Sequence, residues 1–366
     1  MTHLKYETIT SNNIGVDVGL FSDRITFAVE LYTKVTDDML QKKIKVPSST
    51  GLSTVAWYNS GKMENRGWEF NIDVAAVRTK DWGLNFGFNI SQNKNKVLEL
   101  PENQSDETYT FGNKKYAYRV LMGDPLGSFY GYRYKGVYQN VEETYAVDKT
   151  GQQIMDINGA PVVVKNGDQK VYPGDAKYED VNGDGVIDEN DIVYLGNSNP
   201  TLTGGLNFTL RYKKLSLVAA LHGRAGQKVI NESRINMENM YGKNNQSVAV
   251  LRRWRSEGDN TDIPRALYDK GYNYLGSDRF VEDASFLRLK TITLKYQFPE
   301  NWMKPLGINK LEIYATGYDL FVWTKYTGQD PEINLKNPDG SAAQVAIDSN
   351  NTPKAMRFAF GLNLRF

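Results

Sequence analysis

An acidic loop at residues 180–191, DVNGDGVIDEND, carries the side chains whose types and spacing most clearly favour chemistry. Oxygen ligands at alternate positions can converge on one hard cation, and a glycine at the sixth position allows the sharp turn between them. Gly185 occupies that sixth position. The expected ligands are Asp180, Asn182, Asp184, the carbonyl of Val186, Asp188 and Asp191. The spacing predicts one bound Ca²⁺ that makes the loop rigid.

An Asx-turn loop is the alternative for this segment, because aspartate and asparagine side chains also cap their own backbone. Asp191 stands at the last ligand position, where such loops usually have glutamate. Its shorter side chain makes bidentate closure around the ion harder. The number of matching positions, including the glycine, favours calcium.

Catalytic residues are scarce by comparison. His3 and His222 are the only histidines, so the sequence gives no convincing set of residues for a paired zinc site or a Ser-His-Asp relay. The chain has no GxSxG, HExxH or phosphate-loop motif. A pair of carboxylates like that of a glycosidase stays open, because Asp and Glu are plentiful. The residues favour a protein that is not an enzyme.

Composition narrows the class of protein further. The formal net charge is +1 over 366 residues, so no excess of positive charge favours binding to nucleic acid. No cysteine is present, which excludes disulfides and thiolate metal sites. The mean hydropathy of -0.53 suggests a soluble protein, but strands of a membrane barrel alternate and are also low on average. Aromatic residues make up 12% of the chain, which fits the aromatic girdles of such a barrel.

Alternation of apolar and polar residues recurs along the chain and predicts β-strands. The clearest stretches are RITFAVELYTKV, WEFNIDVAA, WGLNFGFNIS, GLNFTLRY, LSLVAALHG, NKLEIYATGYDL and MRFAFGLNLRF. We expect about ten strands, joined by tight turns at one end and by long excursions near 92–127, 140–201 and 225–283 at the other. The alternative is a soluble β-sandwich. Asymmetric loops and a chain that ends on an alternating strand favour a transmembrane barrel.

The phase of the alternation predicts two faces. Trp68, Phe86, Phe208, Leu217 and Phe360 should share one face and point to lipid, opposite Asn71, Asn85, Asn207 and Asn363.

One stretch, NNQSVAVLRRWRSEG, breaks this rhythm. Val248, Leu251 and Trp254 have helical spacing, with Asn245 or Ser247 as the cap, and predict a short loop helix. Its arginines, Arg252, Arg253 and Arg255, are read as a solvated helix face in preference to an anion site.

Several stretches in this order resemble the C-terminal part of SusC/RagA-type TonB-dependent outer-membrane transporters. They are GVDVGLFSDRITFAVELYTKVTDDML, ENRGWEFNIDV, GDPLGSFYGYRYKGVYQN, GDAKYEDVNGDGVIDENDIVYLGNSNPTLTGGLNFTLRYK, VEDASFLRLKTITLKYQFP, LFVWTKYTGQDPEI and the terminal GLNLRF. Together they cover nearly the whole chain. In this resemblance the acidic loop is one of the extracellular loops.

The resemblance implies an all-β fold, an antiparallel transmembrane β-barrel of about 22 strands with long extracellular loops, of which this chain would supply the C-terminal portion. It also implies nutrient uptake, the import of oligosaccharides or peptides across the outer membrane of a Gram-negative, Bacteroidota-type cell. Set against the family, residues 1–366 are expected to be barrel throughout, without plug or TonB box. We also expect no signal peptide, because MTHLKYETITSNN has no basic stretch followed by an apolar core. Alone, such a chain should not transport.

The partners implied are a SusD-like surface lipoprotein, the TonB complex through an N-terminal part, outer-membrane lipid and the barrel assembly machinery. Phe366 would be part of the assembly signal, since a terminal edge strand can be engaged by strand addition. Trp57, Tyr58 and Trp323 are candidates for stacking on sugar rings in a substrate site. Two other functions stay open: a soluble calcium-dependent glycan-binding module and a secreted glycan hydrolase.

Overall fold

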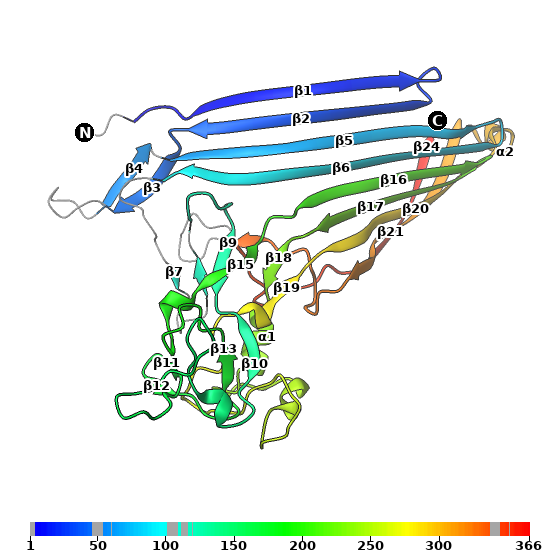
Figure 1. Cartoon of the computed structure of the whole chain (residues 1–366). Helices are drawn as coiled ribbons and strands as arrows, with labels where there is room; N and C mark the ends of the chain where they lie inside the picture. The colour runs from blue at the N-terminus through cyan, green and yellow to red at the C-terminus, as the bar shows by residue number, and fades with distance from the viewer. Residues whose placement is uncertain are drawn as a thin grey trace.

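A nine-stranded antiparallel sheet is the main structure of the chain (Figure 1). The computed structural model describes residues 4–45, 54–59, 61–100, 109–110, 116–118, 120–336, 345–350 and 352–366. In spatial order the strands are β1 (Thr8–Leu20), β2 (Ile25–Asp37), β5 (Lys62–Arg78), β6 (Trp82–Glu99), β16 (Leu202–Tyr212), β17 (Leu215–Ala225), β20 (Phe286–Gln297), β21 (Lys310–Thr324) and β24 (Arg357–Arg365). The sheet is open, with β1 and β24 at its edges.

One face of the sheet is apolar, as the alternation predicts, and is called the apolar face below. Register links Phe86 to Phe208, and Leu210 to both Leu84 and Leu217. The same face runs on through Leu217, Leu294, Ala315 and Phe360, each opposite the next. Trp68 is on the same face, because side chains of β5 alternate and Phe70, Ile72 and Val74 follow Trp68 at every second residue. The predicted lipid-facing set therefore shares one face.

The opposite face, called the polar face below, carries the asparagines. Asn71 pairs with Asn89, Asn85 with Thr209, and Asn207 with Gly87. Asn363 pairs with Glu312 and donates a hydrogen bond of 3.2 Å to its carboxylate. Both predicted faces are confirmed, because a strand's side chains alternate strictly unless a bulge intervenes.

Short connections gather at one end of the sheet and long excursions at the other (Figure 1). Residues 79–81 join β5 to β6, and Lys213 and Lys214 join β16 to β17. The excursion boundaries predicted at 92–127 and 140–201 were wrong, because β6 continues to Glu99 and one excursion runs from there to Leu202. Further excursions join β2 to β5, β17 to β20 and β21 to β24.

The excursions contain many short elements. The strands are β3 (Leu40–Lys45), β4 (Thr54–Asn59), β7 (Tyr109–Thr110), β8 (Ala117–Tyr118), β9 (Ser128–Gly131), β10 (Tyr134–Val137), β11 (Lys165–Asn166), β12 (Gln169–Lys170), β13 (Ala176–Tyr178), β14 (Val186–Ile187), β15 (Val193–Asn197), β18 (Lys228–Ile230), β19 (Val281–Asp283), β22 (Leu335–Lys336) and β23 (Val345–Ala346). The helices are α1 (Glu232–Glu238), η2 (Glu142–Thr144), η3 (Glu189–Asp191), η4 (Val248–Arg252) and η5 (Asp278–Phe280). At the short-turn end, α2 (Glu300–Met303) and η6 (Lys304–Leu306) connect β20 to β21. None of the helices in the described ranges has the length and apolar content needed to cross a membrane.

The closely packed core lies in the excursions, which together form the loop body (the described parts of 116–201, 226–285 and 325–350). One cluster joins Phe129, Ile230, Phe280 and Val345 from different excursions. A second contains Tyr132, Tyr138, Val164, Tyr178, Ile187 and Leu275. A third contains Val229, Ala284, Tyr326, Ile333 and Ala346. Apolar side chains of the sheet are instead exposed; Phe360, for example, is 81% exposed.

The predicted loop helix is shorter than expected. It is the 3₁₀ helix η4, capped by the Ser247 hydroxyl, and it ends at Arg252. Arg253 is extended, and the Trp254 amide donates to the carbonyl of Ile263. Trp254 therefore packs against Gly174 instead of continuing a helical face. Tertiary packing here overrides the local spacing.

Candidate functional site on the polar face

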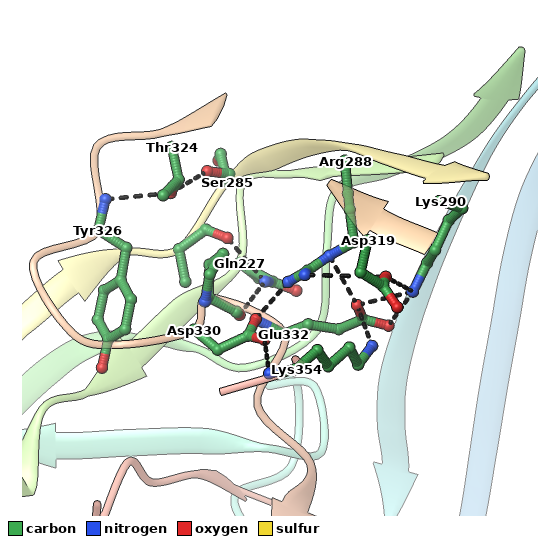
Figure 2. Close-up of polar contacts among 12 residues, drawn as sticks. Gln227, Ser285, Arg288, Lys290, Asp319, Thr324, Tyr326, Asp330, Glu332 and Lys354 are labelled. Carbon is green, nitrogen blue, oxygen red and sulfur yellow. Dashed lines mark hydrogen bonds and ion pairs between the residues drawn. The ribbon is translucent and has the colours of Figure 1, made fainter. Parts of the chain in front are cut away.

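A connected group of charged side chains lies where the excursion between β21 and β24 meets β20 and β21 (Figure 2). We call it the wall network; its members are Arg288, Lys290, Asp319, Asp330, Glu332, Lys354 and Arg357. Arg288 is flanked along β20 by Leu287 and Leu289, which point to the apolar face, so its own side chain lies on the polar face. A register irregularity of β20 and β21 adjoins it, between Leu289 and Thr291.

Arg288 is the centre of the wall network, with only 3% of its surface exposed. Its Nη2 lies 2.5 Å from Asp330 Oδ1, and its Nε lies 3.4 Å from Glu332 Oε2. Asp319 is more distant, at 3.9 Å from Nη1. A guanidinium suits this position because its planar fork can face several carboxylates at once. Removing all the carboxylate partners of such a buried group would leave an uncompensated charge, which costs roughly 3–5 kcal/mol.

Glu332 is held by two lysines as well. Lys290 Nζ lies 3.1 Å from Glu332 Oε2, and Lys354 contacts the same oxygen. Burial acts to raise the pKa of the Glu332 carboxyl, but the hydrogen bonds and charges of Lys354 and Lys290 outweigh it and bring the pKa to about 2. A carboxyl with so low a pKa remains ionised at neutral pH and is unsuited to act as a general acid.

Uncharged contacts fix the same excursion against the sheet. The side-chain amide of Gln227 donates through Nε2 to the carbonyls of Ala284 and Pro331, at 2.8 and 3.1 Å. The Thr324 hydroxyl donates to the Ser285 carbonyl and accepts from the Tyr326 amide (Figure 2). Tyr326 OH donates to Asp348, and burial together with this contact raises the pKa of the phenol. The network and these contacts can hold a loop; they present no nucleophile paired with a base.

Asp330 and Glu332 of the wall network were not predicted as site residues from the sequence. They belong to the stretch TGQDPEI, one of those that carry the family resemblance. Their partners on β20 stand more than 40 residues away, so no local spacing reveals the pairing.

The acidic loop at 180–191 keeps its candidate ligands together, but its side chains face its own backbone. Asp180 accepts from the amides of Gly183 and Gly185, both at 2.7 Å. Asp184 accepts from the Val186 amide and from the Asn182 side chain, both at 2.8 Å. Asp188 caps η3 by accepting from the amide of Asn190.

Asp191 has no exposed surface and accepts from the Val181 and Asp188 amides at 2.7 and 2.9 Å. Burial raises the pKa of this carboxyl, against the lowering effect of the backbone donors. No group of three or more acidic, histidine or cysteine side chains is arranged to hold a metal within the described residues. This geometry is that of the Asx-turn alternative, and Ca²⁺ binding stays a prediction.

The aromatic substrate candidates belong to two elements outside the excursion that carries Asp330 and Glu332. Trp57 and Tyr58 lie in β4, opposite Lys42 and Gln41 of β3. Trp323 pairs with Leu287, and its ring stacks on Phe321 with centroids 6.1 Å apart. That position is on the apolar face, which favours a role at a membrane interface over contact with a sugar. Phe366 follows the end of β24 and is 79% exposed.

The predicted solvated helix face of three arginines is not formed as such, because η4 ends at Arg252 and leaves Arg253 and Arg255 beyond its end. Arg253 and Arg255 donate to the carbonyls of Val250 and Leu251, at 3.4 and 3.0 Å. These carbonyls need partners because η4 ends there. Arg253 and Arg255 therefore satisfy the helix terminus.

Comparison with known proteins agrees with this architecture. The family described as TonB dependent receptor-like, beta-barrel matches residues 2–162. TonB-dependent receptors P26 and P3 of Formosa agariphila are 32% and 30% identical over the whole of this chain. TonB-dependent receptor SusC of Bacteroides thetaiotaomicron is 28% identical, also over the whole chain. The resemblance to SusC/RagA-type TonB-dependent transporters is confirmed.

The fold agrees as well. The structure of the RagAB peptide transporter superposes with a TM-score of 0.72 over 98% of this chain, at 23% identity. The RagAB peptide importer in the open-open state gives 0.73 over 99% of this chain, at 22% identity. The fold is therefore an antiparallel β-barrel wall like that of the RagAB structures, and it is open in this chain. The chain spans about a third of the length of these relatives, 32–35% of the curated proteins and 35% of the RagAB chain.

Proposed function

We propose that this chain forms part of the barrel wall of an outer-membrane, TonB-dependent importer of oligosaccharides or peptides. The observation that carries the proposal is a nine-stranded antiparallel sheet with one continuous apolar face, short turns at one end and a large loop body at the other. A lipid bilayer is the environment in which such a face is stable, and long loops on one side are the usual arrangement of these barrels.

Partners follow from the relatives. SusC and the RagAB transporter are the proteins that this chain resembles, and we infer a SusD-like surface lipoprotein, energy coupling through TonB and passage through the barrel assembly machinery for this one as well. The polar face would then line the lumen, and the wall network would hold the excursion between β21 and β24 against the lumen wall. The acidic loop, if it binds Ca²⁺, would do so within the extracellular loop body.

Membrane placement is tested with spin labels at two neighbouring residues of β16. Phe208 is on the apolar face and Asn207 on the polar face of the same strand, so they are a matched pair. In the intact protein in liposomes, a label at 208 should be quenched by oxygen and a label at 207 by a water-soluble nickel chelate. Equal access of both labels to oxygen would contradict the barrel assignment.

Import is tested by deleting the gene and supplying one nutrient class at a time. Loss of growth on oligosaccharides alone, or on peptides alone, would name the substrate class. A strain lacking TonB should show the same defect, because uptake would draw on the inner-membrane proton gradient. Normal uptake of both classes in the gene deletion would reject the importer function.

A further inference from the structure

A hollow on the apolar face crosses β1, β2, β5 and β6 near the ends of these strands that lead to the excursions. Its volume is about 460 Å³, and its lining includes Asn12, Thr33, Arg66, Trp68, Gln92 and Lys94. Asn12, Thr33, Arg66 and Lys94 form one row across the four strands, each opposite the next. The next row toward the short-turn end contains Ile14, Leu31, Trp68 and Gln92.

The two cations of this row have no acidic partner in the described part of the chain. Arg66 and Lys94 stand directly opposite each other, and both are exposed. Like charges in that arrangement repel and destabilise a sheet. Glu64 is on the same face but stands opposite Lys96, one row further on. Glu69 is opposite Ser91, on the polar face. The pair therefore lacks a counter-anion.

The height of the row relative to the membrane identifies where that anion would come from. Trp82 and Tyr212 are in contact at the short-turn end of the apolar face, with ring centroids 4.4 Å apart and ring planes tilted by 39°. Ten residues of β6 separate Trp82 from Gln92, to which Trp68 donates a 3.1 Å hydrogen bond. That is about 33 Å along the strand, or about 23 Å along the membrane normal at a tilt of about 45°.

An apolar band about 25 Å tall between aromatic girdles is typical of a membrane barrel. Trp68 then marks the second girdle, and Arg66 and Lys94 lie one row beyond it, at the depth of the lipid headgroups. The girdle is on the same side as the loop body, so these headgroups belong to the outer leaflet.

We propose that Arg66 and Lys94 bind the phosphate of an outer-leaflet lipid, whose acyl chains lie along Leu31, Trp68 and Phe70. An arginine suits the phosphate because it can donate two parallel hydrogen bonds, and the lysine adds a point charge. The amide of Asn12 and the hydroxyl of Thr33 complete the row with neutral donors. This inference goes beyond transport and depends only on the placement of the sheet in the membrane.

Lipid binding is tested by native mass spectrometry of the intact, detergent-purified protein titrated with phosphatidylglycerol. Replacing both cations, Arg66→Gln with Lys94→Gln, should weaken binding by about 30-fold, since each basic residue near an anionic surface contributes about fivefold. Arg66→Lys with Lys94→Arg should retain most of the affinity and shows that the hollow tolerates substitution.

Lys34→Gln is the matched control for Lys94→Gln. Lys34 is also exposed, but it stands opposite Asn65 on the polar face, next to the row of Arg66. It should leave phosphatidylglycerol binding unchanged. The proposal would be overturned if Lys34→Gln and Lys94→Gln lost phosphatidylglycerol affinity equally. It would also be overturned if the double variant, Arg66→Gln with Lys94→Gln, bound phosphatidylglycerol as well as wild type.

Two further ligands separate the possible sources of the anion. Diacylglycerol, which lacks the phosphate, should bind the wild-type protein no better than it binds the double variant. Inorganic phosphate at millimolar concentration should not displace the lipid; if it did, the hollow would be a site for free anions and the lipid assignment would be wrong.

Discussion

Glycines on the polar face leave room for large neighbours to lie flat across the sheet. Tyr314 lies over Gly361 on the adjacent strand, and Tyr32 lies over Gly67. Asp73 occupies the space beside Gly87 in the same way. A Cβ at any of these glycines would overlap the neighbouring side chain. The glycines therefore serve close packing rather than a special backbone angle, since none of them has a positive φ.

Gly361→Ala tests this packing. Overlap with the Tyr314 ring should destabilise the β21–β24 pairing by about 1–3 kcal/mol, the usual cost of overpacking. The measurement is the temperature at which the intact barrel loses its heat-resistant migration on gels. Adding Tyr314→Ser should restore most of the loss, because the ring is what the new methyl group meets. A variant as stable as wild type would show that the ring moves aside freely.

The pH dependence of the wall network follows from Glu332. Its pKa is lowered from an ordinary 4.5 to about 2, so the ionised form is favoured by the folded protein. The stabilisation is therefore complete above about pH 4.5 and is lost as the pH falls toward 2. A spin label at Leu335, in the same excursion, should become mobile within this window.

Glu332→Gln removes the titrating group and serves as the control. Its label should be mobile already at pH 7, because Lys290 and Lys354 lose a carboxylate partner, and the loss should be roughly 1–3 kcal/mol. A Glu332→Gln loop as ordered as wild type at pH 7, or a wild-type loop that stays ordered at pH 2, would contradict this account.

The strands were the elements most accessible from sequence, because a two-residue period marks both their existence and their faces. RITFAVELYTKV and WGLNFGFNIS fall within β2 and β6 except for Arg24, as the alternation predicts. The excursions were less accessible, since their many short strands pair over long distances. The parallel pairing of β11 with β14 is an example. The wall network was missed for the same reason, since it needs the return of a distant loop.

Calcium binding is a prediction at the scale of one loop. Isothermal titration of the intact protein with millimolar Ca²⁺ should give heat in the wild type and less in Asp184→Asn, which keeps the shape and removes a charge. Chelation should loosen residues 180–191 while the sheet remains folded, because the loop lies outside the nine strands. If the wild type gave no heat, the calcium prediction would be wrong, and the loop would be held by its Asx-turn hydrogen bonds instead.

Assembly of the whole barrel provides the last prediction. Phe366 follows the edge strand β24, whose backbone groups on one side have no partner strand among the described residues. Deleting Phe366 should lower the amount of assembled protein in the outer membrane much more than Phe208→Ala does. Phe208 is the control because it lies on the apolar face of an internal strand. Equal losses would make Phe366 an ordinary interface aromatic.

The separation between a tightly packed loop body and an open apolar face has a consequence for how the sequence can vary. Phe129 and Phe280 fit among fixed neighbours, so truncating either to Ala should cost about 3–5 kcal/mol. Phe358 and Phe360 project from the sheet, where fluid acyl chains would adapt to any apolar shape. Among related proteins, the identities of lipid-facing residues should therefore drift freely within the apolar class. The interior of the loop body should change only through paired substitutions that preserve its volume.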